Sequence, residues 1–92
     1  MSHDELETMI LGYLTLNGWL AWPTHGPRKR PIMPGIPDIM AVRDGQHAAV
    51  EVKIPPDKLS EKQAKWLTDL AEHGSIICVA TKLEDVYSFA RR

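Results

Sequence analysis

Apolar residues recur at helical spacing near the start of the chain. They fall on one stripe, at i, i+3, i+4, i+7 and i+8, which is typical of an amphipathic helix: Leu6, Met9, Ile10, Tyr13 and Leu14. Ser2 or Asp4 can cap the first turn of this helix, and Asn17-Gly18 is a typical helix end. The apolar segment 19–22 follows at once and predicts a short strand.

A β-hairpin is predicted in the middle of the chain. Two apolar-rich stretches, 37–43 and 46–53, are joined by an Asp-Gly dipeptide at 44–45, which is a strong hairpin signal. A turn at this dipeptide pairs residues whose numbers sum to about 89 or 90, because the two strands run antiparallel. Asp38 then lies opposite residues 51 and 52, beside Glu51.

The remaining pattern predicts a helix, a strand and a second helix. Ser60-x-x-Gln63 is a capping-box sequence that opens the first of these helices, and Gly74 ends it. The residues that this helix is expected to bury are Ala64, Leu67, Leu70 and Ala71. Segment 75–80 is nearly all apolar, as in a strand covered on both faces, and the capping-box sequence 81–84 opens the last helix.

These elements follow the order α-β-β-β-α-β-α. The β-α-β passage near the end implies a parallel strand pair with a right-handed crossover. The predicted fold class is therefore α/β, with a mixed sheet flanked by helices. The chain has 92 residues, of which 43% are hydrophobic and 25% charged. This length and composition are typical of one small globular domain, residues 1–92.

Composition also excludes several classes of protein. The longest apolar runs fall far short of the roughly 18 residues that a membrane span needs, so no membrane partner is expected. The start of the chain lacks the basic-then-apolar pattern of a secretory signal. Cys78 is the one cysteine, which excludes an internal disulfide and fits a reducing cytosol. We therefore expect a cytoplasmic protein.

Three charged residues lie within or beside the predicted hairpin strands. Asp38 lies at the start of the first strand, and Glu51 and Lys53 lie near the end of the second, on the face opposite Val50 and Val52. Two neighbouring carboxylates repel each other unless a cation lies between them. Mg²⁺ takes one or two carboxylates together with waters and phosphate oxygens, and a lysine beside it can hold a water or neutralise charge on phosphorus. Such a set of residues suits hydrolysis of a phosphodiester.

The same residues carry a family resemblance. Gly35-x-Pro37-Asp38 followed by Glu51-x-Lys53 resembles the PD-(D/E)xK nuclease signature. The flanking pattern is similar to the virus-type replication-repair nuclease (VRR-NUC) branch, and the resemblance spans essentially the whole chain. It implies a restriction-endonuclease-like αβββαβ core and a DNA endonuclease that depends on Mg²⁺ or Mn²⁺. Short stand-alone members resemble phage-encoded enzymes that act on branched DNA such as four-way (Holliday) junctions, often as homodimers. A homodimer of phage or bacterial origin is therefore expected.

The resemblance assigns five side chains to the active site, namely Glu7, Asp38, Glu51, Lys53 and Gln63. Among them, Asp38 and Glu51 are expected to hold the metal together with the backbone carbonyl of Val52, and Lys53 to assist the attacking water. The remaining two border the site.

All five assignments have simpler explanations, because Asp38 could merely end a strand and Glu51 and Lys53 could be a solvated face of an edge strand. For the other two residues the simpler explanation fits equally well. The capping box alone accounts for Gln63, and a favourable first-turn acid accounts for Glu7. Glu5 also competes with Glu7 for the place beside the site. These alternatives remain open at the level of sequence.

Basic residues indicate where DNA could bind. The cluster Arg28-Lys29-Arg30 lies in the Pro- and Gly-rich loop 23–36. Two interpretations are open for it: it contacts DNA phosphates, or it only makes the loop soluble. Lys58, Lys62 and Lys65 recur at helical spacing and form either a stripe along DNA or a solvated face.

Histidines contribute little to the sequence-based site. His25 is placed to approach a metal or a phosphate, although a lone loop histidine usually does neither. His3, His47 and His73 show no ligand spacing.

Two other functions are compatible with the same pattern. A non-catalytic DNA-binding or interaction module that retains the nuclease fold should bind DNA in a salt-sensitive way without divalent metal. A nuclease should show cleavage that depends on divalent metal. The chain is also compatible with one subunit or fragment of a larger helicase–nuclease system.

Overall fold

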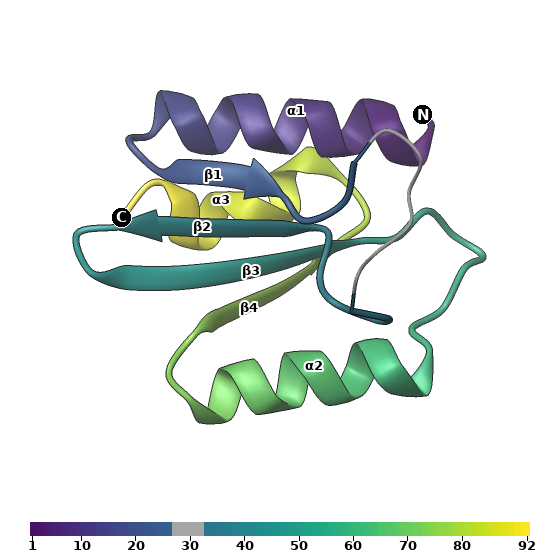
Figure 1. Ribbon diagram of the computed structural model, residues 1–92. Coiled ribbons are helices and arrows are strands. Elements are labelled where there is room, and N and C mark those ends of the chain that lie inside the picture. Colours follow the sequence, from purple (N-terminus) through teal and green to yellow (C-terminus); the bar gives the residue numbers. More distant parts are fainter. Residues whose placement is uncertain (27–32) are drawn as a thin grey trace.

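The computed structural model describes residues 1–26 and 33–92 (Figure 1). The helices and strands follow the predicted order, and they are α1 (His3–Leu16), β1 (Leu20–Pro23), β2 (Ile39–Arg43), β3 (Gln46–Val52), α2 (Glu61–Glu72), β4 (Ile76–Ala80), the 3-10 turn η1 (Leu83–Val86) and α3 (Tyr87–Ala90). The α/β fold class is therefore confirmed.

The strands form one mixed sheet in the order β1-β2-β3-β4. Both β1–β2 and β2–β3 are antiparallel, and β3–β4 is parallel, as the β-α-β passage predicted. In the hairpin Ile39 pairs with Val50, so the residue numbers sum to 89 and the predicted register is confirmed. Asp44 and Gly45 have φ values of 51° and 79°, the left-handed conformation that a two-residue hairpin turn of this twist requires.

The main core lies between the sheet and α1. Ser2 caps α1, since its hydroxyl accepts from the Glu5 N–H at 3.1 Å while the Glu5 carboxylate accepts from the Ser2 N–H at 3.1 Å. The helix buries Leu6, Ile10 and Leu14 completely. The predicted stripe is wrong at Met9, which is 40% exposed, because the face of the helix that meets the sheet is rotated towards residue 7.

The η1–α3 segment closes the same core. Trp19 packs edge-to-face on Phe89 with ring centroids 5.6 Å apart, and its indole N–H donates to the Ala90 carbonyl at 3.1 Å. The predicted capping box at Thr81 and Glu84 is wrong by one residue. Asp85 serves instead, since its Oδ2 accepts from the backbone N–H and the hydroxyl of Thr81.

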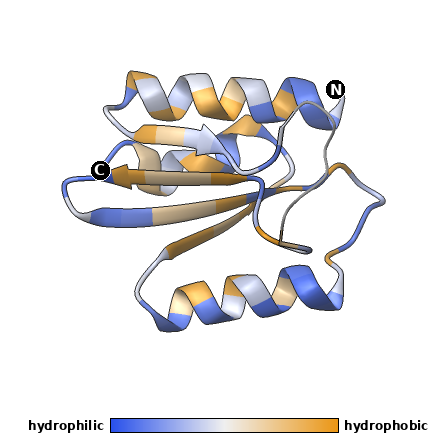
Figure 2. Ribbon diagram, viewed as in Figure 1, coloured by the Kyte–Doolittle hydropathy of each residue, from blue (hydrophilic) through white to orange (hydrophobic). Residues whose placement is uncertain are grey.

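The α2 side of the sheet is more thinly covered. Within α2, all of which is described, Leu67 is the one buried apolar residue; Leu70 is half-buried, and the predicted burial of Ala64 and Ala71 is wrong. The expectation that β4 is covered on both faces is also wrong, because β4 is an edge strand and Val79 is exposed. Figure 2 shows the same contrast, with a hydrophobic β4 beside an α2 that carries many hydrophilic residues. Within residues 1–26 and 33–92, every helix is too short or too polar to span a bilayer.

Candidate active site

One end of the sheet collects the residues that the sequence marks for chemistry. The first turns of α1 and α2, the end of β3 and the start of β2 all lie at this end (Figure 1). Asp38 directly precedes β2, and Glu51 is the penultimate residue of β3. Because Ile39 pairs with Val50, the strand register brings position 38 opposite position 51.

Asp38 is fixed by backbone groups of two neighbouring segments. Its Oδ2 accepts a hydrogen bond from the Val52 N–H at 2.8 Å, which ties the carboxylate to β3. Thr24, just after β1, donates its N–H to the Asp38 carbonyl at 2.9 Å and its hydroxyl to the Pro37 carbonyl at 2.6 Å. The carboxylate is therefore held in place before any ligand binds, as a preorganised site requires.

Glu51 and Lys53 lie side by side at the end of β3. Glu51 is only 2% exposed, and its Oε2 lies 3.7 Å from the Lys53 Nζ. Burial raises the pKa of Glu51 to about 8; the Asp38 carboxylate adds to this shift and the Lys53 ammonium opposes it. Val52, between them, buries its side chain in the core and directs its N–H to Asp38.

Glu7 enters the same site from α1. It is 6% exposed, whereas Glu5 is exposed and used by the capping box at Ser2. Burial raises the pKa of Glu7, the His25 ring opposes the shift and the Asp38 carboxylate adds to it. The Glu7 Oε1 is buried and accepts no hydrogen bond from any described residue. Of the two acids that the sequence left open, Glu7 is the one placed beside Asp38.

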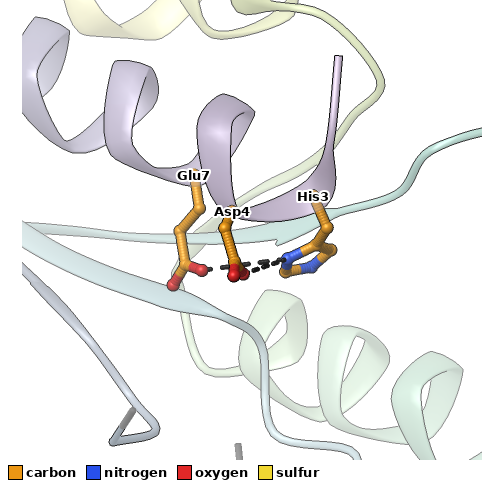
Figure 3. Close-up of side chains that lie close together, drawn as sticks. All are labelled: His3, Asp4 and Glu7. Atoms are coloured by element: carbon orange, nitrogen blue, oxygen red, sulfur yellow. Dashed lines mark ion pairs between the residues drawn. The ribbon is translucent and has the colours of Figure 1, made fainter.

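Two histidines that contributed little to the sequence-based site lie among these carboxylates. The His25 Nε2 is 3.2 Å from Glu7 Oε1 and 3.4 Å from Asp38 Oδ1. The His3 Nε2 is 3.2 Å from Asp38 Oδ2, and its Nδ1 is 3.8 Å from Glu7 Oε2. Figure 3 shows His3, Asp4 and Glu7 projecting together from the first turns of α1. The i,i+4 spacing of His3 and Glu7 was the signal in the sequence that could have indicated this pairing.

Gln63 fulfils its capping role and also borders the site. Its Oε1 accepts from the Ser60 N–H at 2.9 Å, as the simpler explanation predicted. Gly35 has φ +82° and packs so closely on the first turn of α2 that a Cβ would lie 2.7 Å from the Lys62 backbone carbon. Only glycine allows this approach, which brings the loop before Asp38 against the start of α2.

A cleft of about 230 Å³ opens at this end of the sheet. It is lined by His3, Thr24, His25, Gly35, Ile36, Asp38 and Gln63. At about 30 Å³ per water, this volume has room for several waters or for a phosphate group with a hydrated ion.

The predicted DNA-contacting residues are placed only in part. Lys58, in the connection from β3 to α2, and Lys62, in the first turn of α2, are both exposed. The cluster Arg28-Lys29-Arg30 lies outside the described residues.

Comparison with known proteins places the chain in a family. The model of the VRR-NUC domain matches residues 4–82. A solved structure described as a VRR_NUC domain superposes with a TM-score of 0.72 at 18% identity, covering 94% of this chain and 90% of that one. A second, described as a VRR_NUC domain protein, superposes with a TM-score of 0.72 at 17% identity, covering 96% of this chain and 84% of that one. None of the curated proteins matches the chain.

The class defined by the fold and the family is that of nuclease-fold, DNA-processing domains. The chain belongs to the VRR-NUC domain family, as its motifs indicated.

Proposed function

We propose that the chain is a DNA endonuclease that depends on a divalent metal. Asp38, Glu51 and the backbone carbonyl of Val52 would hold Mg²⁺ or Mn²⁺, with Glu7 and Gln63 bordering the site. The observation that carries this proposal is the meeting of two buried carboxylates, Glu7 and Glu51, with the half-buried Asp38 at one end of the sheet, where Lys53 lies beside Glu51.

The residues present suit such an ion. Carboxylate and carbonyl oxygens are the donors that Mg²⁺ and Mn²⁺ prefer. Burial raises the pKa of both Glu7 and Glu51, as expected where carboxylates are gathered away from solvent. The buried Glu7 Oε1, without a hydrogen bond from any described residue, is an oxygen that a cation would satisfy.

The chain's own residues would position the reactants. When bound, a divalent ion polarises the scissile phosphate and lowers the pKa of a water. Lys53 would orient the attacking water and offset negative charge that develops on the phosphorus oxygens. The Val52 N–H keeps Asp38 in position throughout. In-line attack would leave a 5′-phosphate, as the family resemblance implies.

The preferred substrate would be branched DNA, such as a four-way junction. A chain of this size offers few surfaces for reading a base sequence, so shape, backbone and deformability are the features it can sense. Lys58 and Lys62, with the basic cluster 28–30, would contact phosphates. A two-fold homodimer would present two sites to two strands, as paired incisions in a symmetric junction require.

Cleavage of labelled duplex, flap, splayed-arm and four-way-junction DNAs tests this function, with Mg²⁺, Mn²⁺, Ca²⁺ or EDTA. We expect nicking with Mg²⁺ or Mn²⁺ only, strongest on the junction. Asp38→Asn keeps an oxygen for the Val52 N–H, so it should fold normally and lose about 100-fold or more in rate, as should Lys53→Ala. Asp44→Asn, at the opposite end of the hairpin, is the matched control and should cleave like the unaltered chain.

Full activity of Asp38→Asn or Lys53→Ala would contradict the roles assigned to these residues. If the unaltered chain binds DNA in a salt-sensitive way but cleaves none of the substrates with any metal, the non-catalytic module is correct instead. Sizing chromatography against standards tests the homodimer, which requires twice the mass of one chain.

A further inference from the structure

On the basis of the proposed function, we infer that His25 is a direct ligand of the metal, beside Glu7 and Asp38. Its imidazole nitrogen would make the site favour Mn²⁺ over Mg²⁺.

The position of His25 is the first observation. The residue follows β1, and the hydrogen bonds of its neighbour Thr24 to the Pro37 and Asp38 carbonyls hold this segment against the start of β2. The His25 Nε2 lies between two carboxylates, 3.2 Å from Glu7 Oε1 and 3.4 Å from Asp38 Oδ1. Its side chain is only 14% exposed, so the imidazole is directed into the site rather than into solvent.

The surroundings of the two ring nitrogens are the second observation. The His25 Nδ1 lies 3.4 Å from the Gly26 carbonyl oxygen, so the ring nitrogen that faces away from the carboxylates lies near a backbone acceptor. The Nε2 is the ring nitrogen that faces the two carboxylate oxygens. Metal-bound histidines commonly donate their other ring N–H to a backbone carbonyl in this way. A cation among these atoms would be bound by both carboxylate oxygens and by the ring nitrogen.

The third observation concerns the hydrogen bonds of the carboxylate oxygens nearest to the His25 Nε2. Asp38 Oδ2 is already engaged by the Val52 N–H and by the His3 Nε2, so Oδ1 is the oxygen that faces His25. The Glu7 Oε1 accepts no hydrogen bond from any described residue, although the His25 Nε2 is close by. His3, whose Nε2 contacts the engaged oxygen, is a positioning residue in this arrangement.

Ligand chemistry then gives the metal preference. Mg²⁺ prefers oxygen ligands, and it usually binds one or two carboxylates together with waters and phosphate oxygens. Imidazole is an ordinary ligand of first-row transition ions. A site that adds an imidazole to carboxylate and carbonyl oxygens therefore favours Mn²⁺.

Metal binding by the full chain without DNA tests the assignment. Pulsed electron paramagnetic resonance of bound Mn²⁺ should detect coupling to a ¹⁴N nucleus in the unaltered chain. His25→Ala and His25→Gln should lose this coupling and bind Mn²⁺ about tenfold or more weakly, with Mg²⁺ affinity changed less than threefold. His73→Gln is the matched control, because His73 caps the far end of α2. This control and His3→Gln should both keep the ¹⁴N coupling.

Each other outcome overturns the assignment. Coupling that persists in both His25 variants, or that disappears in His3→Gln alone, removes His25 from the ligands. Bound Mn²⁺ without ¹⁴N coupling in the unaltered chain, together with metal-dependent cleavage, leaves the nuclease intact and shows that His25 only pairs with the carboxylates. A chain that binds neither ion and cleaves no DNA refutes the proposed function itself.

Discussion

The two faces of the sheet differ in how they are covered. On the α1 face, the fully buried residues form one continuous cluster with η1 and α3, including Leu6, Ile10 and Val50. On the α2 face, Leu67 is the one buried apolar residue of a fully described helix, and Val79 of β4 is exposed. The Glu51 and Lys53 side chains also belong to this second face.

The residues that stabilise the fold and the residues proposed for chemistry therefore lie largely on different faces of the sheet. Burying a carboxylate such as Glu51 is costly unless it is paired, and the α2 face has little apolar burial to offset this cost. The α1 face therefore supplies most of the folding free energy, and the candidate active site lies where both layers reach the end of the sheet. Substitutions on the two faces should have different consequences.

The largest expected effect on stability is on the α1 face. Ile10→Ala removes a fully buried side chain and should lower the free energy of unfolding by about 3–4 kcal/mol. Leu70→Ala, on the half-buried face of α2, should cost only about 1 kcal/mol. Urea unfolding monitored by circular dichroism measures both. Equal losses would show that the two faces contribute equally.

The second largest loss of stability is expected in the loop before Asp38, which packs against the first turn of α2. Gly35→Ala combines the strain of φ +82° with a Cβ only 2.7 Å from the Lys62 backbone carbon, so we expect a loss of about 2–3 kcal/mol. Gly45→Ala has a similar φ of +79° but open space around the added Cβ, and should cost about 1 kcal/mol. If thermal or urea unfolding gives the same loss for both, the close approach to α2 contributes nothing.

A gain in stability is expected from Glu51→Gln in EDTA. The pKa of Glu51 is raised to about 8, above its ordinary value of 4.5, so the native state holds this proton more tightly than the unfolded chain does. Its contribution to stability is complete below about pH 4.5 and is lost as the pH rises towards 8. The variant does not titrate, so its advantage should grow from pH 5 to pH 8.5 and reach roughly 2 kcal/mol.

Urea unfolding at both pH values measures this gain, with Glu61→Gln as the control on the exposed first turn of α2. A Glu51→Gln advantage that is absent, or that is the same at both pH values, would contradict the raised pKa. The same variant should lose cleavage, since an amide is a poor metal ligand by comparison with a carboxylate.

The smallest effect concerns two adjacent residues of β4. Burial raises the pKa of Cys78 to about 11, and this thiol packs against the core on the α1 face. Alkylation at pH 8 should therefore be at least tenfold slower than in the urea-unfolded chain, because the thiolate is the reactive form. A Cys78→Ala, Val79→Cys double variant moves the thiol to the exposed face and should react at nearly the unfolded rate. Slow reaction of both thiols would show that the second face is covered.

Local signals predicted much of the fold. The Asp-Gly dipeptide gave the hairpin register, and with it the placement of Asp38 opposite Glu51. The capping box at Ser60 and Gln63 gave the start of α2. Ser2-x-x-Glu5 is a capping box too, and it could have assigned Glu5 to the helix start and left Glu7 for the site.

Properties set by distant contacts were not predictable in this way. The spacing of Leu67, Leu70 and Ala71 is helical, but it does not indicate how much sheet lies beneath the helix. The edge position of β4 likewise depends on the order of strands, which periodicity does not report. The histidine contacts to Asp38 come from α1 and from the segment after β1, so they arise only when tertiary structure brings these segments together.

The hydrogen bond from the Val52 amide to Asp38 has an evolutionary consequence. Every amino acid except proline carries a backbone amide proton. Substitution at position 52 can therefore change the side chain without breaking the hydrogen bond to Asp38. An acid anchored to main chain in this manner is insulated from most mutations around it. Divergent sequences could then keep one arrangement of carboxylates while replacing nearly everything else.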